Sequence, residues 1–299
     1  MTLASSAPIT HAMTVDVEDY FHVSAFANVI RPAQWGNWES TVERNTRRLL
    51  DLFDEHGIKA TFFVLGWVAE RYPALIREIV QRGHETASHG YSHQLVYKQT
   101  PDEFRAETTK SKQILEDLTQ RPIVGYRAAS YSITRRSLWA LDILAELGFT
   151  WDSSIFPVHH DRYGIPDSPT TPYRVQTASG KTLLEFPLTT AKLFGLQMPA
   201  AGGGYFRLYP YALSRELFRR ATSGGTSPAI FYLHPWEIDP DQPRVPGASL
   251  LSRFRHYNNL DKCLPRLQTL LREFRFGTVS DSLRSVAVQD SAPVRLSAA

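Results

Sequence analysis

The 299-residue sequence contains a single cysteine, Cys263, and this excludes a fold held together by internal disulfide bonds. Cys263 stands in a leucine-rich stretch of helical pattern, where we expect it to be a buried small hydrophobic residue. No segment approaches the ~18 consecutive apolar residues of a membrane span, so we expect no integral membrane segment. Basic residues are interspersed with acidic ones, 33 against 30, without the basic runs that are typical of nucleic-acid binding.

The N-terminal segment MTLASSAPIT has neither a basic stretch nor a long apolar run, so it lacks the pattern of a secretory signal. We therefore expect a cytoplasmic protein. Hydrophobic residues make up 42% of the chain and charged residues 21%, which is ordinary for a globular protein with a large core. We expect one domain over residues 1–286, followed by a loose tail, rich in Ser and Ala, over 287–299.

Strand-like apolar runs alternate with helical patterns through the first half of the chain. The runs are HAMTVDV, KATFFVLG, HETAS, PIVGYRA and FTWDS, with helices expected near 41–55, 68–82, 101–119 and 135–147. This order indicates an α/β fold with a mainly parallel sheet, either open or closed into a barrel.

The segment 157–210 is irregular and rich in Pro and Gly, with a hairpin expected near Ser179-Gly180. Such a long insertion usually shapes or covers a functional site. Regular pattern returns afterwards, with a helix near 210–222, the strand AIFYLH and a helix near 261–274.

Three carboxylates, Asp16, Glu18 and Asp19, follow one another where the first expected strand ends, in TVDVEDYF (14–21). In a parallel α/β sheet the carboxyl ends of the strands are where catalytic groups collect. Asp16 and Glu18 share a face because strand side chains alternate. Carboxylates this close repel one another unless a cation relieves them. The alternative is a solvated strand end with a helix-capping Asp.

Two histidines, His89 and His93, stand four residues apart in SHGYSH (88–93), after the third expected strand. This spacing brings two imidazoles to one side of a helical turn and suits two ligands of one metal ion. Histidine pairs of this spacing also occur in ordinary surface or core structure. His84, which lies within the strand, is expected to be structural.

Two further expected strands end in residues that could take part in catalysis. Arg127 in GYRAASYS (125–132) could hold a catalytic carboxylate in a bidentate pair, and His234 in FYLHPWEID (231–239) could act as a general acid beside an aromatic wall. Core packing alone does not explain four successive strand ends that carry such residues. Carboxylates with two histidines make a metal site that has open positions for water, as metal-assisted hydrolysis requires.

These motifs, in this order, resemble those of the polysaccharide deacetylases with the NodB homology domain, the family 4 carbohydrate esterases, over about residues 13–236. TVDVEDYF, SHGYSH and GYRAASYS are similar to the first three family motifs, although Gly90 replaces the usual hydroxyl residue of the second. WDSSIFP (151–157) and LHPWE correspond to the fourth and fifth. The resemblance implies a distorted (β/α) barrel of seven strands.

The resemblance also implies catalytic roles. Asp16 corresponds to the base and Arg127 to its partner. His234 corresponds to the general acid that protonates the leaving amine, and Tyr131 would contribute its backbone N–H to the oxyanion site.

The implied metal is a divalent ion, Zn²⁺ with Co²⁺ or Ni²⁺ as alternatives, bound by His89, His93 and a carboxylate. Strand alternation favours Glu18 as the third ligand, whereas a β-bulge would favour Asp19. Some relatives with a D-x-E arrangement and a purine-derived amide substrate work without metal. The two retained histidines argue for a metal here.

The phrases DVEDYF, YRAASYSI and DSSIFP and the segment HYNNLDKC (256–263) resemble more closely the deacetylase subgroup found beside bacterial exopolysaccharide and exosortase (PEP-CTERM) loci. We therefore expect a metal-dependent hydrolase that removes N-acetyl groups from an amino-sugar oligo- or polysaccharide in exopolysaccharide biosynthesis. Arg207 is a candidate contact for an anionic sugar or phosphate. Two alternatives stay open: a metal-independent cyclic amide or ureide hydrolase on the same fold, and a non-catalytic carbohydrate-binding member of a polysaccharide synthesis complex.

Overall fold

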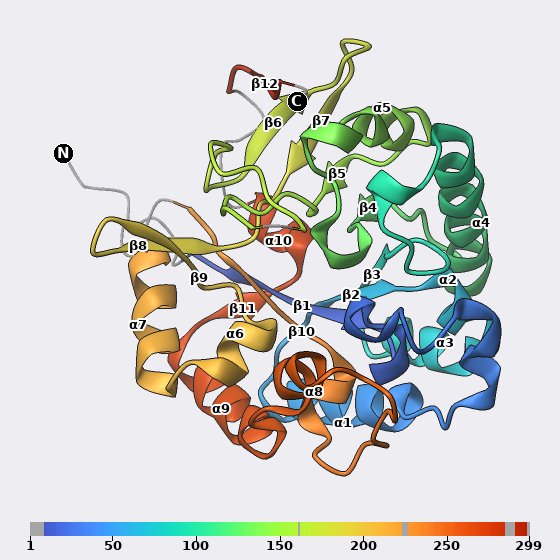
Figure 1. Cartoon of the computed structure of the whole chain (residues 1–299). Coiled ribbons are helices and arrows are strands. Elements are labelled where there is room, and N and C mark those ends of the chain that lie inside the picture. The colour runs from blue at the N-terminus through green and yellow to red at the C-terminus, as the bar shows by residue number, and fades with distance from the viewer. Residues whose placement is uncertain (1–8, 161, 223–226, 285–290, 298–299) are drawn as a thin grey trace.

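The computed structural model describes residues 9–160, 162–222, 227–284 and 291–297. At its centre, seven parallel strands are hydrogen-bonded side by side in the order β10-β1-β2-β3-β4-β5-β7 (Figure 1). They are β1 (His11–Val17), β2 (Thr61–Val64), β3 (Glu85–Ser88), β4 (Gly125–Tyr126), β5 (Trp151–Asp152), β7 (Thr182–Glu185) and β10 (Ile230–Leu233). The expected α/β fold with a mainly parallel sheet is confirmed.

The barrel is distorted between β7 and β10, where single contacts among the described residues replace a strand ladder. Thr189 Oγ1 donates to the carbonyl of Ile230 and accepts from its N–H, both at 2.7 Å. The N–H of Tyr232 donates to the carbonyl of Ala201, also at 2.7 Å. The backbones come so close that a Cβ on Gly202 would lie 2.2 Å from the Tyr232 carbonyl oxygen, so only glycine fits at this junction.

Helices of the first half cover the outside of the strands (Figure 1). They are α1 (Val42–Glu55), α2 (Gly66–Arg71), α3 (Pro73–Gln81), α4 (Pro101–Thr119) and α5 (Trp139–Glu146). The single helix expected over 68–82 is two helices, because Pro73 lacks the N–H that would continue α2 and instead opens α3. All seven residues of β1 are buried, as expected for a parallel strand with both faces covered.

The segment expected to be irregular, 157–210, contains regular structure. β6 (Tyr173–Gln176) forms an antiparallel hairpin with β7, which matches the hairpin expected near Ser179-Gly180, and β7 joins the central sheet. A second hairpin pairs β8 (Thr190–Leu193) with β9 (Leu196–Pro199), and α6 (Gly203–Leu208) follows. The insertion therefore supplies one of the central strands as well as loops.

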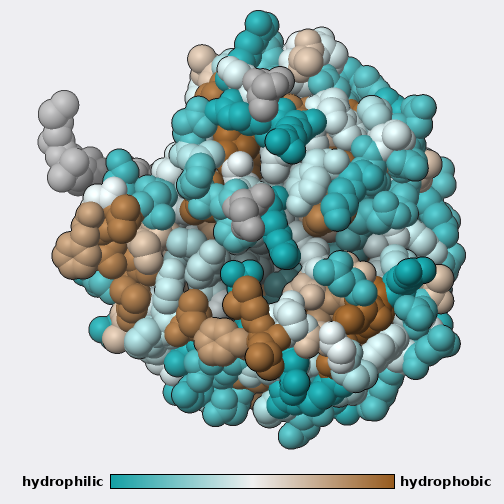
Figure 2. All heavy atoms as spheres, viewed as in Figure 1, coloured by the Kyte–Doolittle hydropathy of each residue, from teal (hydrophilic) through white to brown (hydrophobic). Residues whose placement is uncertain are grey.

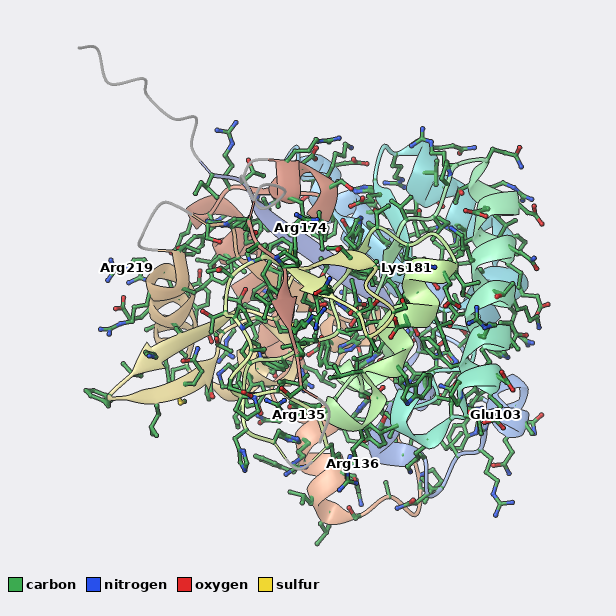
Figure 3. All side chains as sticks on the ribbon, turned by 90° about the horizontal axis from the view of Figure 1, so that it is seen from above. Glu103, Arg135, Arg136, Arg174, Lys181 and Arg219 are labelled. Carbon is green, nitrogen blue, oxygen red and sulfur yellow. The ribbon has the colours of Figure 1, made fainter. Side chains whose placement is uncertain are left out.

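The rest of the second half consists of α7 (Tyr211–Thr222), α8 (Leu250–Tyr257), α9 (Leu260–Glu273), β11 (Phe276–Gly277), α10 (Val279–Arg284) and β12 (Val294–Arg295). Cys263 is buried in α9, as expected. Among the described residues, no helix is both long and apolar enough to cross a membrane. In Figure 3 the charged side chains of Arg219 and Glu103 lie at opposite edges of the molecule.

Part of the tail that was expected to be loose, 287–299, is described by the structure and contains the strand β12. β12 pairs in parallel with β6, with Val294 opposite Val175, and Arg295 Nε donates to Gln176 Oε1 at 2.6 Å. The pairing covers a strand edge that the β6–β7 hairpin would otherwise leave open. Residues 285–290 and 298–299 lie outside the described part.

Two segments far apart in the sequence meet over the carboxyl ends of the strands. One contains three short 3₁₀ helices, η1 (Tyr20–His22), η2 (Ser24–Phe26) and η3 (Pro32–Asn37), and the other runs from the end of β10 through α8. Their aromatic side chains form one buried cluster, in which Phe26 lies 4.7 Å from His256, centroid to centroid. This cluster forms one wall of the candidate site.

Candidate active site

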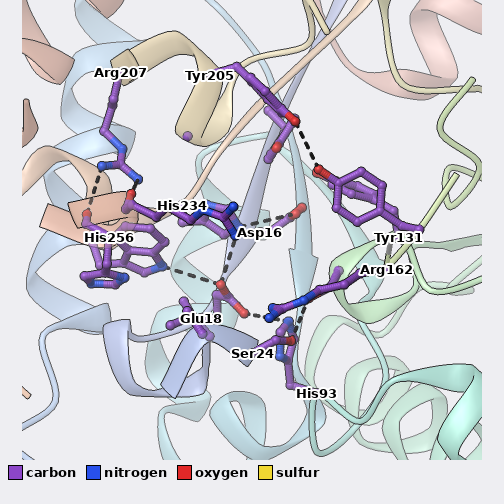
Figure 4. Close-up of a pocket in the computed structure, with 18 of the residues that line it drawn as sticks. Asp16, Glu18, Ser24, His93, Tyr131, Arg162, Tyr205, Arg207, His234 and His256 are labelled. Carbon is purple, nitrogen blue, oxygen red and sulfur yellow. Dashed lines mark hydrogen bonds and ion pairs between the residues drawn. The ribbon is translucent and has the colours of Figure 1, made fainter. Parts of the chain in front are cut away.

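A cavity of about 420 Å³ opens at the carboxyl ends of β1 and β10, and Figure 2 shows it as a hollow near the centre of the molecular face. Six of the residues singled out from the sequence line it: Asp16, Glu18, His93, Tyr131, Arg207 and His234. The structure thus brings together residues that are separated by up to 218 positions in the chain. Figure 4 shows how they converge from different elements.

Asp16 pairs with Arg127 at the bottom of the cavity. Arg127 Nη1 donates to Asp16 Oδ1 at 2.7 Å and to Thr14 Oγ1 at 2.9 Å, and both residues of the ion pair are almost completely buried. The guanidinium is fixed on its other side by Ser153, whose carbonyl and hydroxyl accept from Nε and Nη2. Asp16 is therefore held in one orientation, with Oδ2 directed at His234.

Glu18, His89 and His93 form a cluster in which one donor atom from each residue lies within 4.8 Å of the others. Glu18 Oε2 is 2.9 Å from His93 Nε2. His89 donates from Nδ1 to the carbonyl of Arg127 at 2.8 Å, which leaves Nε2 as the ring nitrogen for a metal. Burial lowers the pKa of His89 to about 4, so the ring is neutral, as a ligand must be. The donor set therefore fits a divalent metal ion.

The two histidines do not lie on a helical turn, contrary to the expectation from their spacing. Residues 89–94 form a loop, and the imidazoles meet, with centroids 5.3 Å apart, because the chain turns through left-handed conformations at Gly90 (φ 74°) and His93 (φ 51°). A left-handed φ strains residues that have a Cβ, which explains glycine at position 90. His84 lies outside the cluster and accepts from the N–H of Ala60 at 3.1 Å.

Asp19, the other carboxylate that the sequence left open as a ligand, lies outside the metal cluster. Its oxygens accept hydrogen bonds from the hydroxyl of Ser40 (2.6 Å), from the N–H and hydroxyl of Thr41, and from the N–H of Val42. Asp19 therefore caps the N-terminus of α1 across 22 residues of sequence. Strand alternation predicts the observed division of roles, with Glu18 in the cavity and Asp19 in the scaffold.

His234 is directed at both carboxylates of the cavity (Figure 4). Its Nε2 lies 3.4 Å from Glu18 Oε1 and 3.9 Å from Asp16 Oδ2, and its ring stacks on Trp236 at 5.0 Å. On the other side of the ring, Nδ1 lies 2.7 Å from Glu237 Oε1. Burial opposes protonation, but Glu18 and Glu237 outweigh it and raise the pKa of His234 to about 9.

Arg207, the residue expected to contact an anionic sugar or phosphate, lines the cavity, but its guanidinium is also held by groups of the protein. It is 2% exposed, and its Nε donates to Glu237 Oε2 at 2.5 Å while Nη1 donates to the carbonyls of His256 and Asn258. Although burial opposes ionisation, Arg207 and His234 lower the pKa of Glu237 to about 2. Arg207 and Glu237 thus form a buried support behind His234.

The backbone N–H of Tyr131, assigned to the oxyanion by resemblance, is already engaged. It donates to the carbonyl of Ala128 at 3.1 Å, inside a tight turn with left-handed φ at Ser130 and Tyr131. The side chain of Tyr131 does line the cavity.

Sequence reasoning did not single out Glu237, Ser153 or Arg162. Glu237 had a local signal, because a glutamate three residues after His234, with Pro235 between them, is the spacing of a capping box. Ser153 holds Arg127 from a neighbouring strand end, and Arg162 extends toward Glu18 in Figure 4; neither stands in a pattern that marks it.

Fold and site together define an α/β barrel with a candidate metal-hydrolase centre. Residues 35–151 match the family model "Polysaccharide deacetylase", and residues 153–284 match a domain of unknown function, DUF3473. The first part of the chain is thus similar to polysaccharide deacetylases and the second part to DUF3473. The two matched segments form one sheet, because β7 and β10 belong to the second. His234 likewise comes from the second segment, while His89, His93 and Arg127 come from the first.

Curated relatives that the chain resembles are N-deacetylases, which hydrolyse amide bonds. The peptidoglycan-N-acetylglucosamine deacetylase of Bacillus cereus is 40% identical over 73 residues, 24% of this chain and 26% of the relative. The peptidoglycan deacetylase of Helicobacter pylori is 29% identical over 141 residues, 47% of this chain and 44% of the relative. The chain thus spans less than half the length of these relatives.

Solved structures share the fold over nearly the whole chain. A candidate polysaccharide deacetylase from Mycobacterium smegmatis has a TM-score of 0.63 at 22% identity and covers 99% of both chains. The family 4 carbohydrate esterase from Streptomyces lividans has a TM-score of 0.51 at 14% identity and covers 96% of this chain and 100% of its own. The allantoinase PuuE has a TM-score of 0.58 at 18% identity and covers 95% of this chain and 91% of its own. At these identities the likeness shows the fold alone.

Proposed function

We propose that this protein is a metal-dependent carbohydrate N-deacetylase. The observation that carries the proposal is the convergence, in one cavity, of the Glu18–His89–His93 cluster with the Asp16–Arg127 pair and with His234. A binding protein needs neither a buried carboxylate–arginine pair nor a supported imidazole at this place, whereas hydrolysis of an amide needs a base and an acid on opposite sides of the reaction.

Each side chain has a place in the hydrolysis. A divalent ion bound by Glu18, His89 and His93 would polarise the acetyl carbonyl and acidify a water molecule. Asp16 accepts the proton of the attacking water on Oδ2, because Arg127 occupies Oδ1. His234 gives its Nε2 proton to the sugar nitrogen as the C–N bond breaks, so that acetate and a free amine leave.

Two substitutions separate the roles of base and ligand. Asp16→Asn keeps the bound metal but lowers turnover by roughly 10²–10⁴-fold, since the amide cannot take the proton. His89→Ala loses the metal as well. The measurements are metal content by mass spectrometry and release of acetate from N-acetylglucosamine oligomers. His84→Gln is the matched control, a buried histidine outside the cavity, and it keeps metal and activity. An Asp16→Asn enzyme with full turnover would remove Asp16 from the role of base.

The proposal also specifies the substrate class, the metal ion, the biological role and the cellular location. The named substrates of the relatives, peptidoglycan and chitooligosaccharides, make N-acetylglucosamine oligomers the first class to assay. The motif resemblance supports a role in exopolysaccharide biosynthesis, and the nitrogen-rich ligand set supports Zn²⁺. A cytoplasmic location is the remaining part, and cell fractionation tests it.

A chelator distinguishes the proposal from the competing hydrolase of cyclic amides or ureides. The deacetylase loses activity when the chelator removes the metal and regains it when Zn²⁺ is added back. A metal-independent ring-opening enzyme keeps its activity on a cyclic ureide such as allantoin throughout. The Glu18–His89–His93 cluster supports the first outcome.

A further inference from the structure

Helix α8 exposes three large apolar side chains at the surface. Leu250 is 82% exposed, Leu251 58% and Phe254 57%. Single exposed apolar residues are common on soluble proteins, but three on one short helix form a contiguous apolar surface that water solvates poorly. We call Leu250, Leu251 and Phe254 the α8 patch.

The α8 patch is bordered by positive charge. At about 100° per residue, the three apolar side chains share one side of the helix, with Arg253 and Arg255 on its two flanks and the buried His256 opposite. The surrounding segment 243–260 contains three arginines, Arg244, Arg253 and Arg255, and no Asp or Glu. Its formal charge is therefore +3, in a chain whose net charge is +3 over all 299 residues.

The α8 patch adjoins the active-site cavity. Phe254, Arg255 and His256 line that cavity, together with Leu208, which is itself 48% exposed. In Figure 2 an apolar area lies directly beside the hollow, where Figure 1 draws α8. A partner that binds the α8 patch therefore also lies at the mouth of the cavity.

We propose that α8 docks this protein on the surface of a lipid bilayer that contains anionic lipids. An apolar helix side flanked by arginines is complementary to such a surface. The leucines and the phenylalanine insert at the boundary between headgroups and acyl chains, and the lipid phosphates pair with the guanidinium groups. A second copy of this chain fits less well, since two segments of charge +3 would face each other.

Docking would present the cavity to saccharides carried at the membrane surface. This consequence rests on the proposed deacetylation, whereas docking itself does not. Vesicle binding is therefore measured on the full chain without substrate, and acetate release from soluble N-acetylglucosamine oligomers is measured separately. A failure of docking then appears only in the first assay, and a failure of the proposed function only in the second.

The test is co-sedimentation with vesicles of phosphatidylcholine and phosphatidylglycerol in about equal parts, with pure phosphatidylcholine as reference. The wild-type chain binds the anionic vesicles and is released by high salt. The double variant Leu250→Ser/Leu251→Ser, which leaves the cavity lining intact, binds about tenfold more weakly. Arg253→Gln binds about fivefold more weakly and depends less on salt. Both variants deacetylate soluble oligomers at the wild-type rate.

The β8–β9 hairpin provides the matched control. Its tip exposes Phe194 (95%) and Leu196 (66%), well away from α8 in Figure 1. Phe194→Ser/Leu196→Ser removes a similar apolar area and keeps full vesicle binding. The proposal is overturned if the wild-type chain does not bind anionic vesicles. It is also overturned if the hairpin variant loses vesicle binding while the α8 variant keeps it, or if light scattering shows that α8 joins two copies of the chain.

Discussion

The carboxylate of Glu237 lies 2.7 Å from Nδ1 of His234 through one oxygen and contacts Arg207 through the other. Because the ionised carboxylate only accepts, Nδ1 of His234 donates to it and the direction of the imidazole is fixed. In the protonated imidazolium the second proton lies on Nε2, which faces Asp16 and Glu18. Acid catalysis at His234 therefore depends on a residue that does not itself reach the substrate cavity.

Glu237→Gln is expected to lower kcat roughly 10- to 100-fold while metal content stays unchanged. His234 acts in its protonated form, so activity falls as the pH rises through its pKa. Because Glu237 helps to raise that pKa, removing its charge moves the basic limb of the pH–rate profile to lower pH. A variant with reduced kcat but an unmoved basic limb would contradict this role for Glu237.

Gly90 is expected to be needed for the histidine loop. Its φ of 74° is unfavourable for alanine, so Gly90→Ala should destabilise the fold by about 1–2 kcal/mol and weaken metal binding by displacing His89 and His93. Gly148→Ala is the control, because its φ of 81° imposes similar strain far from the metal ligands and an added Cβ there meets no atom within 4 Å. Calorimetry should find equal losses of stability in both variants and a loss of metal affinity only in Gly90→Ala.

The parts of the fold that follow from periodicity could be predicted from the sequence. HAMTVDV corresponds to β1, and the helices expected at 41–55 and 101–119 appear within a residue of those bounds, because buried strands and amphipathic helices leave local patterns. The shared face of Asp16 and Glu18 followed from strand alternation alone.

The features of the structure that could not be predicted depend on contacts between residues that are distant in the sequence. Asp19 has its role only because Ser40 and Thr41 come to it, and Arg207 is neutralised by Glu237, 30 residues away. The C-terminal strand β12 pairs with β6 across more than a hundred positions. Local composition in these segments suggested solvent exposure or disorder, and tertiary contacts decided otherwise.

The buried acid pair of Asp152 and Glu185 predicts that the stability of the fold depends on pH. Burial raises the pKa of Asp152 to about 6, and burial with repulsion from Asp152 raises the pKa of Glu185 well above its usual value. The folded protein thus holds a proton that the unfolded chain releases above about pH 4.5. Stability falls as the pH rises, by about 1.4 kcal/mol per unit for one proton.

Glu185→Gln should remove most of that slope, because an amide keeps a donor toward Asp152 without having to hold a titrating proton. Urea unfolding at pH 5 and pH 7 should show the wild-type chain losing about 2–3 kcal/mol more than the variant between the two conditions. Equal losses in both proteins would mean that the pair is ionised in the folded state or hydrated.

Substitutions at Glu18 and Asp19 test the division of roles between two adjacent carboxylates. Glu18→Gln removes a charged donor from the cluster with His89 and His93, so metal content should fall while the melting temperature of the metal-free protein stays nearly unchanged. Asp19→Asn should do the reverse. Its oxygens accept from Ser40, Thr41 and Val42, so the change should cost about 1–2 kcal/mol of stability and leave metal affinity intact. If Asp19→Asn lost the metal and Glu18→Gln kept it, the β-bulge alternative would hold, and the strand end would have to rearrange when the ion binds.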